Sequence, residues 1–182
     1  MKTKFNFVKN LLLLLAFSFT LLGCTNEALD LQEEALNSEG ELSARPGTQL
    51  HFNTSLNGKN IVPDPISTKA VGQGIVKISK DEAKIHYKIT TANIENIFVA
   101  HFHMASADAN GSPVALLYLN QNQPSGPANG VLAEGYITAE TLGGGEEGAE
   151  KLYNLIAAIR SGNIYINVHS TAFPSGEIRG QL

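Results

Sequence analysis

The sequence predicts a mainly β fold, an antiparallel sandwich or barrel of about eight strands with one late helix. Short segments in which apolar and polar residues alternate recur along the chain, and turn-forming Gly, Asn, Asp and Pro separate them. Helical periodicity is confined to one late stretch, 146–161. A parallel α/β fold would need helices between most of its strands, so the pattern favours antiparallel pairing.

The expected strands can be placed in chain order. Residues 50–56 alternate in polarity and end at Asn57-Gly58, after which Pro63 and Pro65 interrupt pairing because proline lacks a ladder donor. The other expected strands are 74–79, 83–91, 97–104, 114–119, 130–137, 163–169 and 176–182. The expected helix ends before Gly162, and its apolar residues recur at three- and four-residue spacings: Ala149, Leu152, Tyr153, Ile156 and Ile159.

Residues 1–23 have the features of an export signal. A basic start precedes the apolar run 11–22, which suits a signal peptide and is short for a membrane span. The motif Leu21-Leu22-Gly23-Cys24 resembles the lipobox of bacterial lipoproteins, and Cys24 is the only cysteine. We therefore expect a lipid anchor on Cys24 that holds the protein to a membrane of the bacterial cell envelope, the outer membrane in particular. A plain signal peptide and an uncleaved anchor helix are the alternatives.

Charge separates a tether, 24–44, from a folded domain, 45–182. Residues 25–44 carry six acidic residues and no Lys or Arg, which predicts an acidic tether; a short helix over 29–36 is the alternative. From Arg45 onward, ten basic residues balance eleven acidic ones. The domain therefore lacks the basic field that nucleic acid would need as a partner.

The segment from about Gln49 to Leu182 resembles the CHRD domain. The matching pieces are Leu56-Asn-Gly58, Ile61-Val-Pro63, Ala70-Val-Gly72, Ala100-His-Phe-His-Met104, Asn110-Gly-Ser-Pro-Val114, Gly135-Tyr-Ile-Thr138, and Ile164-Tyr-Ile-Asn-Val-His169 through Phe173-Pro-Ser-Gly-Glu-Ile-Arg-Gly-Gln-Leu182. This family is distantly similar to copper/zinc superoxide dismutases, so the resemblance implies an immunoglobulin-like, superoxide dismutase-like β-sandwich or barrel. It implies no general enzymatic activity. Met104 stands where members often have Gly, so the following loop is expected to differ in shape.

Three histidines are the candidate metal ligands: His101, His103 and His169. By strand periodicity His101 and His103 share one face with Val99, whereas the more apolar set, Phe98, Ala100, Phe102 and Met104, is expected to face the core. Two imidazoles on one strand face can chelate Cu or Zn, and His169 would add a third ligand if its strand is a neighbour. The domain has too few histidines for full dismutase chemistry; His51 and His86 are expected to have surface or hydrogen-bonding roles.

For these histidines the sequence favours a structural polar cluster over the metal site, and a catalytic acid/base site is a third interpretation. In the structural interpretation the last hairpin brings His169 towards Glu177, and Arg179, on the same strand face, holds Glu177 or a backbone carbonyl. The chain has no nucleophile elbow, phosphate-binding loop or His-Glu-x-x-His motif. The sequence thus favours a non-catalytic binding or structural module that engages an envelope protein or glycan, and the alternative is a metal-binding, redox-active domain.

Overall fold

The computed structural model describes residues 49–182 of the 182-residue chain. The expected signal peptide, Cys24 and the acidic tether lie outside this part. No helix within 49–182 is long and apolar enough to cross a membrane.

The domain is mainly β, as the sequence predicts, with eight strands and one α-helix among the described residues. The strands are β1 (His51–Asn57), β2 (Val71–Ile78), β3 (Lys84–Glu95), β4 (Ile97–Met104), β5 (Pro113–Leu119), β6 (Pro127–Thr138), β7 (Ile164–Ser170) and β8 (Ile178–Gln181). The helix is α1 (Gly145–Arg160), and two short 3-10 turns, η1 (Gly58–Asn60) and η2 (Glu140–Leu142), follow β1 and β6.

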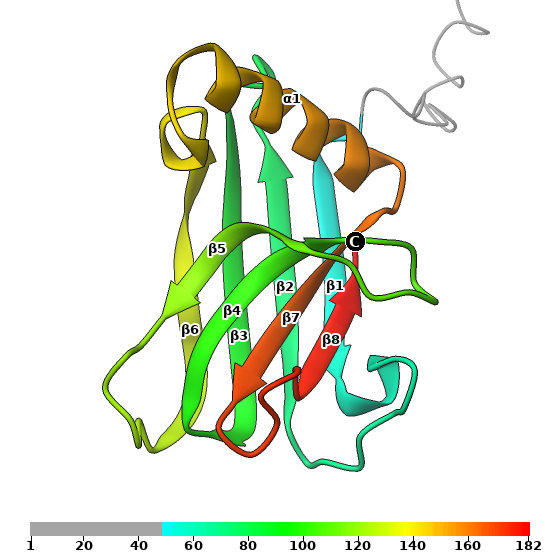
Figure 1. Ribbon diagram of the computed structural model, residues 1–182, viewed down its shortest axis with the longest axis vertical. Coiled ribbons are helices and arrows are strands. Elements are labelled where there is room, and N and C mark those ends of the chain that lie inside the picture. Colours follow the sequence, from blue (N-terminus) through cyan, green and yellow to red (C-terminus); the bar gives the residue numbers. More distant parts are fainter. Residues whose placement is uncertain (1–48) are drawn as a thin grey trace, which may run out of the picture. The chain divides into compact units, whose positions relative to one another are not determined.

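The strands form one antiparallel sheet in the order β5-β4-β7-β8-β1-β2-β3-β6. Figure 1 shows that the sheet folds over itself, so that β5, β4, β7 and β8 lie in front of β6, β3, β2 and β1. The junction between the layers is a single register pair, Asn57 with Arg179. Across the interior, Tyr87 Oη in β3 donates a hydrogen bond to the Leu117 carbonyl in β5 (2.9 Å). The result is a nearly closed, barrel-like sheet.

The hydrophobic core fills the space between the layers. Its members come from all eight strands, and α1 crosses one end of the layers (Figure 1) and adds Leu152, Leu155, Ile156 and Ile159. Tyr153, which the helical spacing places on the apolar face, is instead 68% exposed, and Leu155 takes its place in the core. Burial of these apolar side chains is the main term that holds the layers together.

The observed bounds of β4 match the expected strand, but its faces differ from the prediction in part. Ala100 and Phe102 are fully buried in the core, as expected. Phe98 is only partly buried, because the ladder to β7 is irregular between Ile97 and Val99 and Ile97 enters the core in its place. Met104, at the end of the strand, is 41% exposed. Elsewhere β3 runs on past 91 to Glu95 through bulges, and β8 begins later than expected, at Ile178.

We expect Phe102→Ala to destabilise the domain by about 3–5 kcal/mol, because it empties a fully buried site between the layers. Urea unfolding followed by circular dichroism measures this change. Leu116→Ala, on the neighbouring strand β5 but 54% exposed, is the matched control and should shift the free energy of unfolding by about 0.5 kcal/mol or less. Equal losses in the two variants would contradict this assignment of the core.

Candidate metal centre

The three candidate histidines come from two adjacent antiparallel strands. In the β4–β7 ladder, Val99 pairs with His169, His101 with Asn167 and His103 with Tyr165. Because side chains two residues apart share a face, all three imidazoles lie on the face of this layer that points away from the core. The strands that supply them were both expected from the sequence, and the structure makes them neighbours.

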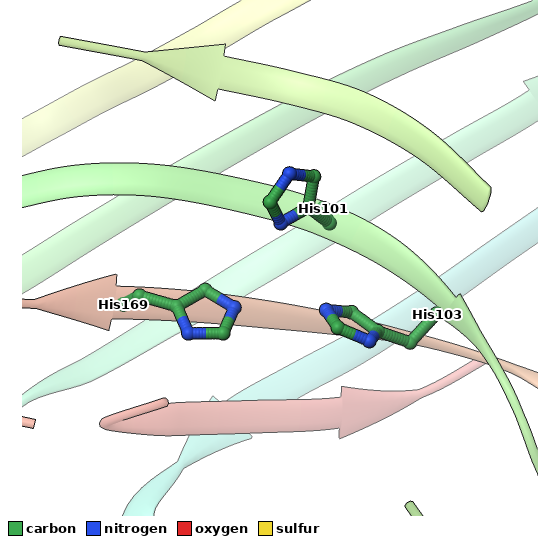
Figure 2. A group of neighbouring side chains, drawn as sticks. All are labelled: His101, His103 and His169. Carbon is green, nitrogen blue, oxygen red and sulfur yellow. The ribbon is translucent and has the colours of Figure 1, made fainter. Parts of the chain in front are cut away.

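The imidazole rings form a nearly equilateral triangle. Their centroids are 5.6 Å apart for His101 and His103, 5.8 Å for His101 and His169, and 5.7 Å for His103 and His169. One nitrogen from each ring lies within 4.8 Å of the others. Figure 2 shows the rings of His101 and His103 from β4 and of His169 from β7 gathered around one point.

The hydrogen bonds of two rings leave their inner nitrogens free to act as ligands. His103 Nδ1 donates to the Gly111 carbonyl (2.9 Å), and His169 Nδ1 donates to the Pro174 carbonyl (3.0 Å). A carbonyl oxygen can only accept, so in a neutral ring the proton is on Nδ1 and the lone pair is on Nε2. A backbone acceptor on the far nitrogen is the arrangement that orients histidine ligands in metal sites.

Three buried imidazole nitrogens have no hydrogen-bond partner within 49–182: His101 Nδ1, His103 Nε2 and His169 Nε2. Leaving a polar atom buried and unpaired costs about 1–3 kcal/mol, so such atoms are uncommon and here they occur together. At a metal–nitrogen distance of about 2.0–2.1 Å, the ligand nitrogens would be about 3.3–3.6 Å apart. Small side-chain rotations would bring the three atoms to that spacing.

The surroundings keep all three imidazoles neutral near pH 7. Burial lowers the pKa of His101 to about 4, with further lowering from His169 and His103. Burial also lowers the pKa of His103, an effect that the Gly111 carbonyl opposes and Arg179 reinforces. The pKa of His169 is lowered by burial, against the opposing effect of the Pro174 carbonyl. Neutral imidazole is the form that binds a metal ion.

The loop 105–112 covers one side of this histidine cluster. Arg179 donates to the carbonyls of Ser106 and Ala109, both at 3.0 Å, and to Asn110 Oδ1 at 3.2 Å. Gln181 Nε2 donates to the Ala105 carbonyl (3.0 Å). These bonds hold the loop beside His103, which contacts the Gly111 carbonyl and is only 8% exposed on a face that the sequence indicated as polar. His169, also 8% exposed, contacts the Pro174 carbonyl of the turn before β8 instead.

Tyr165 is the main residue of the site that sequence reasoning missed. Its ring stacks on His103, with centroids 5.0 Å apart and planes at 16°, and the Arg179 guanidinium lies 3.6 Å from the centre of its ring. The Gly111 amide donates to Tyr165 Oη (3.2 Å). The alternation that places Tyr165 on the same strand face as His169 was the available signal, but the stacking depends on the β4–β7 register.

The expected contact between His169 and Glu177 is wrong. The chain turns at Gly176 (φ 121°), and Glu177 accepts hydrogen bonds from Ser170 Oγ (2.5 Å) and Thr68 Oγ1 (2.7 Å). Arg179 was expected to hold either Glu177 or a backbone carbonyl, and it binds backbone carbonyls of the loop 105–112. Glu177 therefore fastens the hairpin to the segment before β2 and lies outside the triangle of histidines.

The remaining histidines lie apart from the cluster. His51 is exposed on β1. His86 Nε2 lies 3.0 Å from Glu134 Oε1, between β3 and β6. Both positions agree with the surface and hydrogen-bonding roles expected from the sequence.

The metal-free protein should lose stability as the pH falls from 7 to 5. An imidazole whose pKa is lower in the folded state binds protons more readily when the chain is unfolded. The free energy of unfolding therefore falls as the pH drops below about 6.5, the pKa of histidine in the unfolded chain. With a discount for the partial exposure of His101, the loss between pH 7 and pH 5 should be roughly 1–2 kcal/mol. Urea unfolding in the presence of a chelator measures it. His101→Gln should flatten this pH dependence and His51→Gln should not; an unchanged slope in His101→Gln would contradict the assignment.

Comparison with known families agrees with the resemblance that the sequence motifs indicate. The model of the CHRD domain matches residues 52–182, which include all three histidines and every strand except the first residue of β1. No curated protein matches the chain, and no solved structure does. The match covers well over half of the sequence. The chain therefore belongs to the CHRD domain family.

Proposed function

We propose that this protein is a lipid-anchored binding module of the bacterial cell envelope whose CHRD domain binds one copper or zinc ion through His101, His103 and His169. The observation that carries the proposal is the convergence of three buried, unpartnered imidazole nitrogens. Membership of the CHRD family suggests a binding or structural module, and the histidine triangle supplies the chemistry of the binding.

The contacts of the rings favour a metal site over a purely structural polar cluster. In a structural cluster the inner nitrogens would be expected to bond one another or a neighbouring carboxylate, which would offset the cost of burial. Here the outer nitrogens of His103 and His169 are bonded to carbonyls and the inner ones are unpaired. The carboxylate expected to complete such a cluster, Glu177, is bonded to Ser170 and Thr68. A bound ion would satisfy all three inner nitrogens at once.

The geometry supports ion binding and gives no support to acid/base catalysis. A general acid or base must exchange a proton with a substrate at a pKa near the working pH. The pKa of each of the three imidazoles is lowered. Glu177, the carboxylate that was expected as their partner, is bonded to Ser170 instead. We therefore propose a non-catalytic role. His101 is the least buried of the three and also lines a surface pocket of about 650 Å³, which gives an ion a route from solvent.

One equivalent of Cu or Zn should bind per chain, and saturation at 100 times the dissociation constant should stabilise the domain by about 2.7 kcal/mol. Metal analysis after dialysis and thermal unfolding measure the two effects. Replacing His101 and His103 together by Ala should weaken binding at least about 100-fold, because two of the three ligands are lost. His51→Ala is the matched control and should bind as the wild type does. A double variant that retains full occupancy would contradict the site.

For the anchor, Cys24→Ser should move the protein from the membrane fraction to the soluble fraction of cells and abolish its labelling by radioactive palmitate. The reason is that the thiol of Cys24 is the proposed point of acylation and the chain has no other cysteine. Adding Ser43→Cys to that variant restores a thiol outside the lipobox and should restore neither property. Labelling of the Cys24→Ser protein would rule out the proposed anchor.

A further inference from the structure

The charges around the histidine cluster bear on whether it would bind a monovalent or a divalent metal ion. All three ligand side chains are neutral, and the cluster of potential ligands found within 49–182 contains no carboxylate or thiolate. Most sites for divalent ions that use fewer than four protein ligands include a carboxylate or a bound water. The ligands here supply no negative charge to balance a divalent ion.

Behind His103 lies a permanent positive charge. Arg179 is 2% exposed, and its guanidinium lies 3.6 Å from the centre of the Tyr165 ring, which in turn stacks on His103. The column Arg179–Tyr165–His103 thus runs from a buried cation to a ligand of the proposed ion. The charge of Arg179 also acts on His103, because it contributes to the lowered pKa of that histidine.

No carboxylate neutralises this cation at contact distance among the described residues. Its hydrogen-bond acceptors are the carbonyls of Ser106 and Ala109 and the side-chain amide oxygens of Asn110 and Gln181, all of them uncharged. The salt bridges of the described domain do not include Arg179. Asp108, on the exposed part of the loop, acts on Arg179 only at longer range. The guanidinium charge is therefore held close to the site and poorly screened.

From this arrangement we infer that the site binds copper as the monovalent ion in preference to zinc, and that Arg179 sets the preference. The inference rests on the proposed metal-binding function. Repulsion between Arg179 and a bound ion scales with the ion's charge, so a divalent ion loses about twice as much binding free energy as a monovalent one. At a separation on the order of 10 Å in a partly buried site, one unit of charge changes affinity by about tenfold. Three imidazoles can hold either ion, because zinc completes its four-coordinate shell with a water at such sites, so the charge of Arg179 is what separates the two ions.

The test is the ratio of the affinities for Cu⁺ and Zn²⁺, measured on the full chain by competition with chromophoric chelators, the copper arm under anaerobic conditions with ascorbate. Arg179→Gln removes the charge and should shift the ratio about tenfold towards Zn²⁺. Arg179→Lys keeps the charge and should leave the ratio within about threefold of the wild type. A purely structural role of Arg179, through the loop that it holds, would lower both affinities together and leave the ratio unchanged.

Two further variants keep the test decisive if changes at Arg179 unfold the protein. Asp108→Asn removes the exposed carboxylate that acts on the Arg179 guanidinium at long range. Because it takes away negative charge, it should shift the ratio the other way, towards Cu⁺. Arg160→Gln, a cation on α1 that pairs with Glu82, is the matched control and should leave the ratio as it is. If Cu⁺ and Zn²⁺ both bind but Arg179→Gln and Asp108→Asn leave the ratio unmoved, the inference is overturned and the metal site stands. If the wild-type chain binds neither ion, both are overturned.

Discussion

The antiparallel pairing of β4 with β7 is the constraint on which the rest of the site depends. A slip of one residue would turn every side chain of one strand to the opposite face, so the histidines of the two strands would no longer meet. The core prevents that slip. Phe102 and Ala100 of β4 and Ile166 and Val168 of β7 are fully buried on the inner face, and the same register places the imidazoles on the outer face. Hydrophobic burial therefore positions the polar site.

Covering the outer face creates the chemical situation that defines the site. The loop 105–112 lies beside His103, whose ring is bonded to the Gly111 carbonyl, and Arg179 and Gln181 of β8 hold the loop there by binding its backbone carbonyls. Removing water from the rings lowers the pKa of each and leaves the inner nitrogens unpaired. Neutral imidazoles beside a buried cation are the arrangement on which the proposed ion binding, and its proposed dependence on the charge of the ion, rest. The same residue, Arg179, thus holds the loop beside His103 and places a positive charge near the cluster.

Several features could be predicted from the sequence because they are encoded within single segments. The alternation in 97–104 predicts β4 with its observed bounds, and the apolar spacing in 146–161 predicts α1 to within one residue at each end. Individual faces were harder to predict. Tyr153 and Met104 are apolar and fit the expected inner faces, but both are exposed, because the core accepts only side chains that point between the two layers. A pattern along one segment does not specify where that segment meets the others.

By itself the sequence determined the antiparallel β class, the family motifs and the identity of the three histidines as candidate ligands. Only the tertiary structure decided what those histidines face. It turned Glu177 away to Ser170 and Thr68, stacked Tyr165 between His103 and Arg179, and bonded the outer nitrogens of His103 and His169 to carbonyls. The physical reason is that period-two alternation assigns a side chain to a face of its own strand. Its partners on that face come from distant parts of the chain, and register and turn geometry choose them.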